Sequence, residues 1–171
     1  MIPAYAKPGD FVLAHMSGDV ATWIRIGQIL NGSGFSDYEH AFVYIGHGNI
    51  VEAGGNGAVL TPYHYGTNVL WSSGIIPLTD VQREAVVTAA TGYTGVGYSY
   101  ADYFALAAHR LHIPAPDLKS YIATSKHMIC SQLVDQAYED AGVHLFKDGR
   151  WPGYVTPGDL WQLLQLPDRR R

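Results

Sequence analysis

A predicted β-hairpin at residues 39–53 constrains the fold of this chain more than any other segment. Residues 39–45, EHAFVYI, are rich in β-branched and aromatic side chains, and the strand pattern resumes at residues 50–53, IVEA. Residues 46–49, GHGN, supply the glycine and asparagine typical of tight turns. Because a hairpin joins antiparallel neighbours, we expect a small, mainly antiparallel sheet or barrel.

The turn decides which side chains share a face of this hairpin. Because side chains alternate along a strand, His40, Phe42 and Tyr44 lie on one face. A connection with an odd number of loop residues pairs Glu52 with Tyr44 or Phe42, which places it on that face. A four-residue loop pairs Glu52 with Val43 and turns it away. Bringing His40 and Glu52 together therefore requires the odd connection.

Other periodicities add short strands and several helices. We expect strands at residues 9–15, 58–61, 69–71 and 75–78, and helices at residues 19–30, 80–91, 104–109, 130–141 and 157–164. Thr79 and Gln82 have the spacing of a capping box at the start of the second helix. The predicted fold class is α+β, with the sheet followed by the helix that begins at Cys130. We expect one domain over residues 1–171, with residues 168–171 as a flexible tail.

Composition and charge exclude several classes of protein. Of the 171 residues, 47% are hydrophobic and 15% are charged, which is typical of a globular domain. A net charge of -4 offers no electrostatic footprint for nucleic acid, and no apolar run approaches the about 20 residues that span a bilayer. The first residues lack a signal-peptide pattern, which favours a cytoplasmic location for the sequence as written. Phage lysis or a specialised secretion system would export such a chain without a readable signal.

Cys130 is the only cysteine and begins a segment with helical spacing. Leu133, Val134, Ala137 and Tyr138 recur along one face of this segment. Backbone N–H groups and the positive end of the helix dipole stabilise a thiolate at a helix start, and the same groups can hold an oxyanion. A single cysteine forms no internal disulfide, so Cys130 serves either packing or chemistry. Taken alone, an isolated cysteine on a helix is more often a packing residue.

A cysteine nucleophile needs a base within hydrogen-bond reach and a third polar group that orients the base. His40 on one strand, Glu52 on its neighbour and Cys130 at a helix start would meet where helix and sheet join. Each residue alone has a simpler explanation, since His40 fits a hydrogen-bonded sheet histidine and Glu52 a solvated carboxylate. Glu52 is nevertheless an unusual residue for a buried strand, because burying a carboxylate without a partner is costly.

No metal or cofactor is predicted. His109 and His112 have the i, i+3 spacing of two metal ligands, but Pro114 follows and no carboxylate lies nearby in the sequence. The other histidines have no such spacing and are expected on the surface or in hydrogen-bonded loops: His15, His47, His64, His127 and His144. The glycines at positions 92, 95 and 97 follow a helix, so they do not form a dinucleotide-binding motif.

The order of these motifs resembles a known family. Four segments are similar to motifs of the circularly permuted NlpC-like papain-fold hydrolases of the YiiX type. They are residues 9–10 before a strand, residues 40–46 with Glu52 after the turn, residues 97–100 and residues 130–134. In ordinary papain-like enzymes the cysteine helix precedes the histidine-bearing sheet, whereas in the permuted group the histidine and its acidic partner come first. The resemblance extends from about residue 9 to residue 164.

This resemblance implies a permuted papain-like catalytic domain with Cys130 as nucleophile, His40 as base and Glu52 as the residue that orients the base. Tyr98 occupies the place of a tyrosine near the nucleophile, which implies an oxyanion or positioning role, although packing is the simpler explanation. The implied activity is cysteine-dependent hydrolysis of an amide or peptide through an acyl-enzyme, with no metal and no cofactor. Substrates would be peptides, peptidoglycan fragments or acyl-amides.

Two alternatives remain open at the level of the sequence. The same three residues serve an acyltransferase or a lipid or acyl-amide hydrolase, because an alcohol or amine can replace water at the same acyl-enzyme. In the second alternative the domain is a catalytically silent binding module, with Cys130 buried and a tyrosine-rich surface for partners. The substrate and the oligomeric state are not indicated by the sequence.

Overall fold

The computed structural model describes residues 1–16, 36–55, 57–97, 128–150, 152 and 155–165. The helices expected at residues 19–30 and 104–109, and the expected tail at residues 168–171, lie outside these ranges. So does the residue Tyr98.

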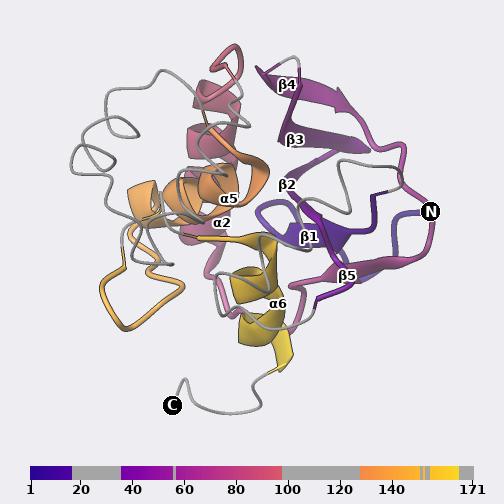
Figure 1. Ribbon diagram of the computed structural model, residues 1–171. Helices are drawn as coiled ribbons and strands as arrows, with labels where there is room; N and C mark the ends of the chain where they lie inside the picture. The colour runs from indigo at the N-terminus through magenta and orange to yellow at the C-terminus, as the bar shows by residue number, and fades with distance from the viewer. Residues whose placement is uncertain (17–35, 56, 98–127, 151, 153–154, 166–171) are drawn as a thin grey trace.

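The described part of the chain is an α+β structure built on one antiparallel sheet (Figure 1). Its strands are β1 (Phe11–Ala14), β2 (His40–Gly46), β3 (Asn49–Gly54), β4 (Gly57–Pro62) and β5 (Val69–Trp71). Their order across the sheet is β4-β3-β2-β1-β5, and every neighbouring pair is antiparallel. The expected α+β class, hairpin and small antiparallel sheet are therefore confirmed.

The hairpin has the odd connection that the sequence left open. Phe42 lies opposite Glu52, and Tyr44 lies opposite Ile50. Five residues therefore separate Tyr44 from Ile50, and Glu52 lies on the same face of the sheet as His40.

A β-bulge next to the turn produces this register. Gly46 pairs with Asn49, and the register shifts between Tyr44 and Gly46, where Ile45 is the extra residue. The two turn residues, His47 and Gly48, have positive φ angles of 51° and 75°. Positive φ at both central positions is typical of the tight turns whose twist matches a hairpin.

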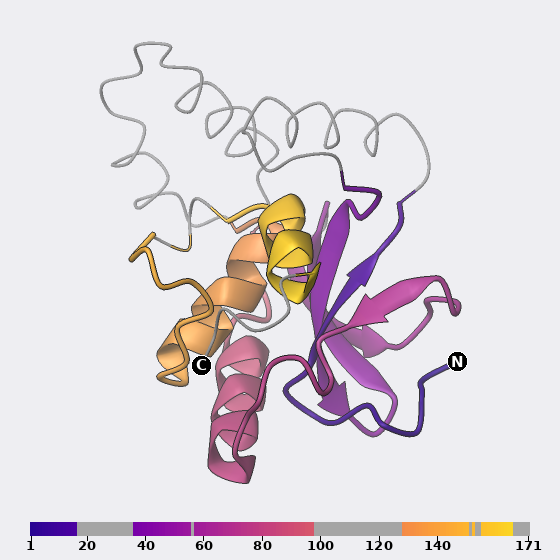
Figure 2. The same ribbon diagram turned by 90° about the horizontal axis from the view of Figure 1, so that it is seen from below.

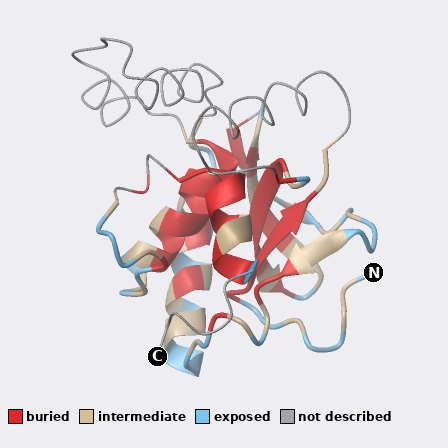
Figure 3. Ribbon diagram, turned by 60° about the horizontal axis from the view of Figure 1, so that its bottom comes forward, coloured by how far each residue is buried: buried red, intermediate tan, exposed pale blue. Residues whose placement is uncertain are grey.

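Three described helices cover one face of the sheet (Figure 2). They are α2 (Asp80–Gly92), α5 (Cys130–Asp140) and α6 (Pro157–Gln165). The capping box predicted for α2 is present, since the Thr79 side chain accepts from the Gln82 N–H and the Gln82 side chain accepts from the Thr79 N–H. Helix α5 packs against β2, β3 and α2, and most of its residues are buried (Figure 3).

The two faces of the sheet have different surroundings. The main core fills the space between the sheet and the helices, where Phe11 and Val43 meet Leu133. The opposite face carries an aromatic cluster that includes Phe42 and Trp71. The connection between β4 and β5 covers this cluster, and its tyrosines pack against both of these rings.

The strand expected at residues 75–78 is wrong. The backbone N–H groups of Ile75 and Ile76 both donate to the Ser72 carbonyl, each at 3.0 Å, so this apolar segment forms a turn after β5. Hydrophobic content favours burial here, and Ile76 is indeed buried. A local turn satisfies the backbone instead of a neighbouring strand.

Asp10 anchors the start of the chain to two later elements. Its buried carboxylate accepts hydrogen bonds from Ser73 Oγ at 2.5 Å and from the Arg83 guanidinium of α2 at 2.8 Å. Gly9 has a φ of 86°, and a Cβ there would lie 3.0 Å from the Arg83 Cα. The Tyr138 hydroxyl of α5 donates to the Gly9 carbonyl at 2.6 Å. The Gly9-Asp10 pair therefore has a structural role, joining β1 to α2 and α5.

Candidate active site

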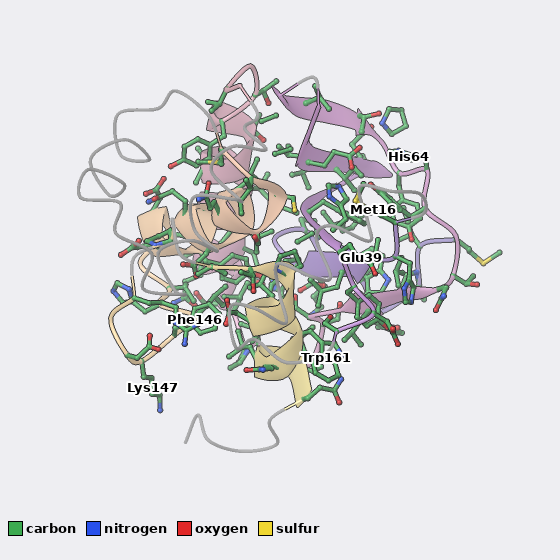
Figure 4. The ribbon with its side chains drawn as sticks, in the orientation of Figure 1. Met16, Glu39, His64, Phe146, Lys147 and Trp161 are labelled. Carbon is green, nitrogen blue, oxygen red and sulfur yellow. The ribbon has the colours of Figure 1, made fainter. Side chains whose placement is uncertain are left out.

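His40 and Glu52 form a hydrogen-bonded pair on adjacent strands. His40 Nε2 lies 2.8 Å from Glu52 Oε2, and the two side chains are only 8% and 12% exposed. The acidic neighbour in sequence, Glu39, does not take this place, and it accepts instead from the backbone N–H of Met16 at 2.8 Å (Figure 4). A carboxylate that accepts from Nε2 holds the ring orientation and leaves the other ring nitrogen for a second partner.

Cys130 is that second partner. The thiol is hydrogen-bonded to the His40 side chain and is 1% exposed. Because Glu52 occupies Nε2, the nitrogen that remains for the thiol is Nδ1. Cys130 is the first residue of α5 and His40 is the first residue of β2, so the two meet where the helix layer reaches the end of the strand. The structure thus brings together Cys130, His40 and Glu52, the three residues of the implied site that lie within the described ranges.

The start of α5 is held by its own side chain. Gln132 Oε1 accepts from the buried backbone N–H of Ile129 at 2.9 Å, which fixes the chain as it enters the helix. The N–H groups of a first helical turn have no partner within the helix, and Cys130 is the first residue of α5. Such groups can stabilise a negative oxygen that forms on a carbonyl bound at the thiol.

The pair and the thiol change the protonation of both residues. Burial alone lowers the pKa of His40, but hydrogen bonds with Cys130 and Glu52, together with their charges, outweigh burial and raise this pKa to about 9. For Glu52, burial raises the pKa, and hydrogen bonds from His40 and Tyr65 overcome it, so the net pKa is lowered. At neutral pH the site therefore holds an imidazolium beside a carboxylate.

Two residues next to Glu52 were not predicted. The Tyr65 hydroxyl donates to Glu52 Oε2 at 2.5 Å, and His64 Nε2 lies 3.6 Å from Glu52 Oε1. His64 is on the surface, as expected, with 56% of its side chain exposed (Figure 4). It nevertheless adjoins the Glu52 carboxylate. Both residues come from the connection after β4, and the alternation Tyr63-His64-Tyr65 was the only sequence signal for them.

Three other residues considered from the sequence cannot be placed in the structure. Tyr98, His109 and His112 lie outside the described residues. Among the residues that the structure does describe, no group of three or more His, Cys, Asp or Glu side chains is arranged to hold a metal ion. Within the same ranges, none of the helices has the length and apolar character needed to cross a bilayer.

Comparison with known proteins adds no family to this picture. No protein-family model matches the chain, and no curated protein gives a significant match. The function of this chain is therefore inferred from the geometry of Cys130, His40 and Glu52.

Proposed function

We propose that this protein is a cysteine-dependent amide or peptide hydrolase. Cys130 is the nucleophile, His40 the acid and base, and Glu52 the carboxylate that orients His40. The observation that carries the proposal is the 2.8 Å contact between His40 Nε2 and Glu52 Oε2, on an imidazole whose other partner is Cys130. A thiol next to an imidazole, with a carboxylate on the far side of that imidazole, is the arrangement that activates a cysteine.

The reaction proceeds through an acyl-enzyme. The Cys130 thiolate attacks the substrate carbonyl, and N–H groups of the first turn of α5 hold the oxyanion. The C–N bond breaks as the His40 imidazolium gives its proton to the leaving amine, and a thioester to Cys130 remains. Water then attacks the thioester while His40 takes a proton from it. The carboxylic acid leaves, and the thiolate–imidazolium pair is restored.

The order of elements along the chain supports a permuted papain-like fold of the NlpC type. The hairpin β2–β3 with His40 and Glu52 precedes α5, which begins with Cys130. In the resemblance this order distinguishes the permuted group from ordinary papain-like enzymes. The Gly9-Asp10 pair that the resemblance also uses acts here as the anchor of β1.

Alkylation of Cys130 tests the central claim, and the single cysteine makes the signal specific. An imidazolium beside the thiol favours the reactive thiolate. At pH 6, iodoacetamide should therefore modify the folded protein about tenfold or more faster than the His40→Gln variant. His144→Gln, which changes an exposed histidine on the loop after α5, should react like the parent, and Cys130→Ser should not react.

The same measurement separates the enzyme from the binding module. Because Cys130 is only 1% exposed, a purely structural thiol would resist iodoacetamide until the protein unfolds. Such an inert thiol, or an equal rate in the parent and in His40→Gln, would contradict the proposal.

Analysis of the reaction products would identify the substrate class and show whether water or another nucleophile accepts the acyl group. We propose peptidoglycan stem peptides as the first substrates to assay, and acyl-amides and acyl lipids as the second. Mass spectrometry of the products distinguishes hydrolysis from transfer, since a hydrolase releases a free acid and an acyltransferase gives a new ester or amide.

A further inference from the structure

The connection between β4 and β5 brings an additional aromatic residue to the site. These two strands lie at opposite edges of the sheet, so residues 63–68 must pass over β3, β2 and β1. They pass on the side away from the helices, which is the side that carries Phe42 and Trp71 (Figures 1 and 2).

Packing on both sides holds the Tyr65 ring. It stacks on Phe42, with ring centroids 4.5 Å apart and an angle of 18° between the planes. It also stacks with His64 at 4.4 Å and lies 5.9 Å from the His40 ring. These contacts fix the direction of the hydroxyl, since a tyrosine has only two side-chain torsions.

The Tyr65 hydroxyl is aimed at the carboxylate of the site. It donates to Glu52 Oε2 at 2.5 Å, the same oxygen that faces His40 Nε2. A phenol has one proton, so this hydroxyl is committed to Glu52 and is not a donor for an oxyanion. The described groups that face Glu52 are therefore His40 from β2 and both Tyr65 and His64 from the connection.

We propose that Tyr65 is a positioning residue that locks the Glu52 carboxylate in the rotamer and charge state that His40 requires. Its hydroxyl and His40 Nε2 both contact Glu52 Oε2, and the hydroxyl keeps the Glu52 carboxylate from rotating away from His40. The consequence for catalysis rests on the function proposed above, whereas the effect on Glu52 itself does not.

The experiment compares Tyr65→Phe with Tyr63→Phe in the full chain. Tyr63 is a matched control, because it lies in the same connection and its hydroxyl donates to the Gly66 carbonyl at 2.9 Å. Carbon-detected NMR titration of Glu52 should show a higher carboxyl pKa in Tyr65→Phe and no change in Tyr63→Phe. Iodoacetamide modification of Cys130 at pH 7 should slow several-fold in Tyr65→Phe alone.

The outcomes separate this proposal from the proposed function. An inert Cys130 in the parent with a raised Glu52 pKa in Tyr65→Phe would overturn the hydrolase and support the positioning role. An unchanged Glu52 pKa in folded Tyr65→Phe would overturn the positioning role, because this variant keeps the aromatic ring and removes only the hydroxyl. If Tyr65→Phe does not fold, the Tyr65 Cζ resonance in Glu52→Leu, which has no side-chain acceptor, serves instead: a shift relative to the parent supports the hydrogen bond, and no shift overturns it.

Discussion

The pKa of His40 reflects the electrostatic effects of burial, Cys130 and Glu52 together. It is buried, yet its pKa is raised to about 9 because Cys130 and Glu52 favour the charged form more than burial opposes it. A buried histidine without such partners would be neutral at the same pH. The unusual charge state therefore depends on partners from two other elements, β3 and α5.

Replacing Glu52 tests this dependence at the level of one residue. Glu52→Gln removes the negative charge and keeps the size, so the pKa of His40 should fall from about 9 toward its ordinary value of about 6.5. NMR titration of the His40 ring measures the change. The control is Glu84→Gln, which alters an exposed carboxylate on α2 and should leave the His40 titration as it is in the parent. A His40 pKa that stays near 9 in Glu52→Gln would remove Glu52 from the site.

The β2–β3 hairpin is the element that places the carboxylate. Its bulge at Ile45 adds the one residue that brings Glu52 to the His40 face. Without this residue the side-chain alternation would turn Glu52 toward the opposite face. The geometry of the candidate site therefore depends on turn chemistry several residues away from it.

A glycine substitution in the turn separates backbone strain from side-chain contacts. Gly48 has a φ of 75°, and a Cβ there would meet nothing within 4 Å, so Gly48→Ala costs only the backbone term. We expect a loss of about 1 kcal/mol in the free energy of unfolding, measured by urea denaturation. Gly54→Ala is the control, because it also meets nothing within 4 Å and has no positive φ, and it should be neutral or slightly stabilising. Equal effects of the two changes would show that the turn is not strained by a side chain.

At the scale of the molecule, Asp135 and His40 are described groups that bind protons more tightly in the folded chain and that titrate between about pH 4 and 9. Asp135 on α5 has its pKa raised to about 7, first by burial and then by the charge of Glu139, with Asp148 and Asp159 adding to it and Arg150 opposing it. The pKa of His40 is raised to about 9. A group with a raised folded-state pKa stabilises the fold below its unfolded pKa, and that stability is lost as the pH rises through the folded value.

These two groups should therefore make the stability of the protein fall with rising pH in two windows that overlap near pH 7. Asp135 accounts for the loss between its ordinary pKa of 3.8 and about 7, and His40 for the loss between 6.5 and about 9. In urea unfolding across this range, Asp135→Asn should flatten the lower window and His40→Gln the upper one. A curve for Asp135→Asn that runs parallel to the parent between pH 4 and 7 would contradict the assignment.

Much of the architecture follows from local patterns in the sequence. Short apolar or β-forming runs bounded by turn residues predicted β1 to β5, and residues 130–141 and 157–164 were predicted as the helices α5 and α6. The capping box at Thr79 marked the start of α2, because a side chain three residues away can satisfy the free N–H groups there. The segment at residues 75–78 was mistaken for a strand, since its apolar residues are buried but its backbone bonds to Ser72.

The site itself depended on contacts that no local pattern contains. The sequence offered Cys130, His40 and Glu52 as candidates, but whether Glu52 shared a face with His40 rested on one bulged residue. Tyr65 reaches Glu52 only because β4 and β5 lie at opposite edges of the sheet and their connection must cross it. Periodicity and capping act over a few residues and can be read along the chain. Register, strand order and the packing of α5 on the sheet are set by burial and hydrogen bonding between distant segments, which only the folded structure brings together.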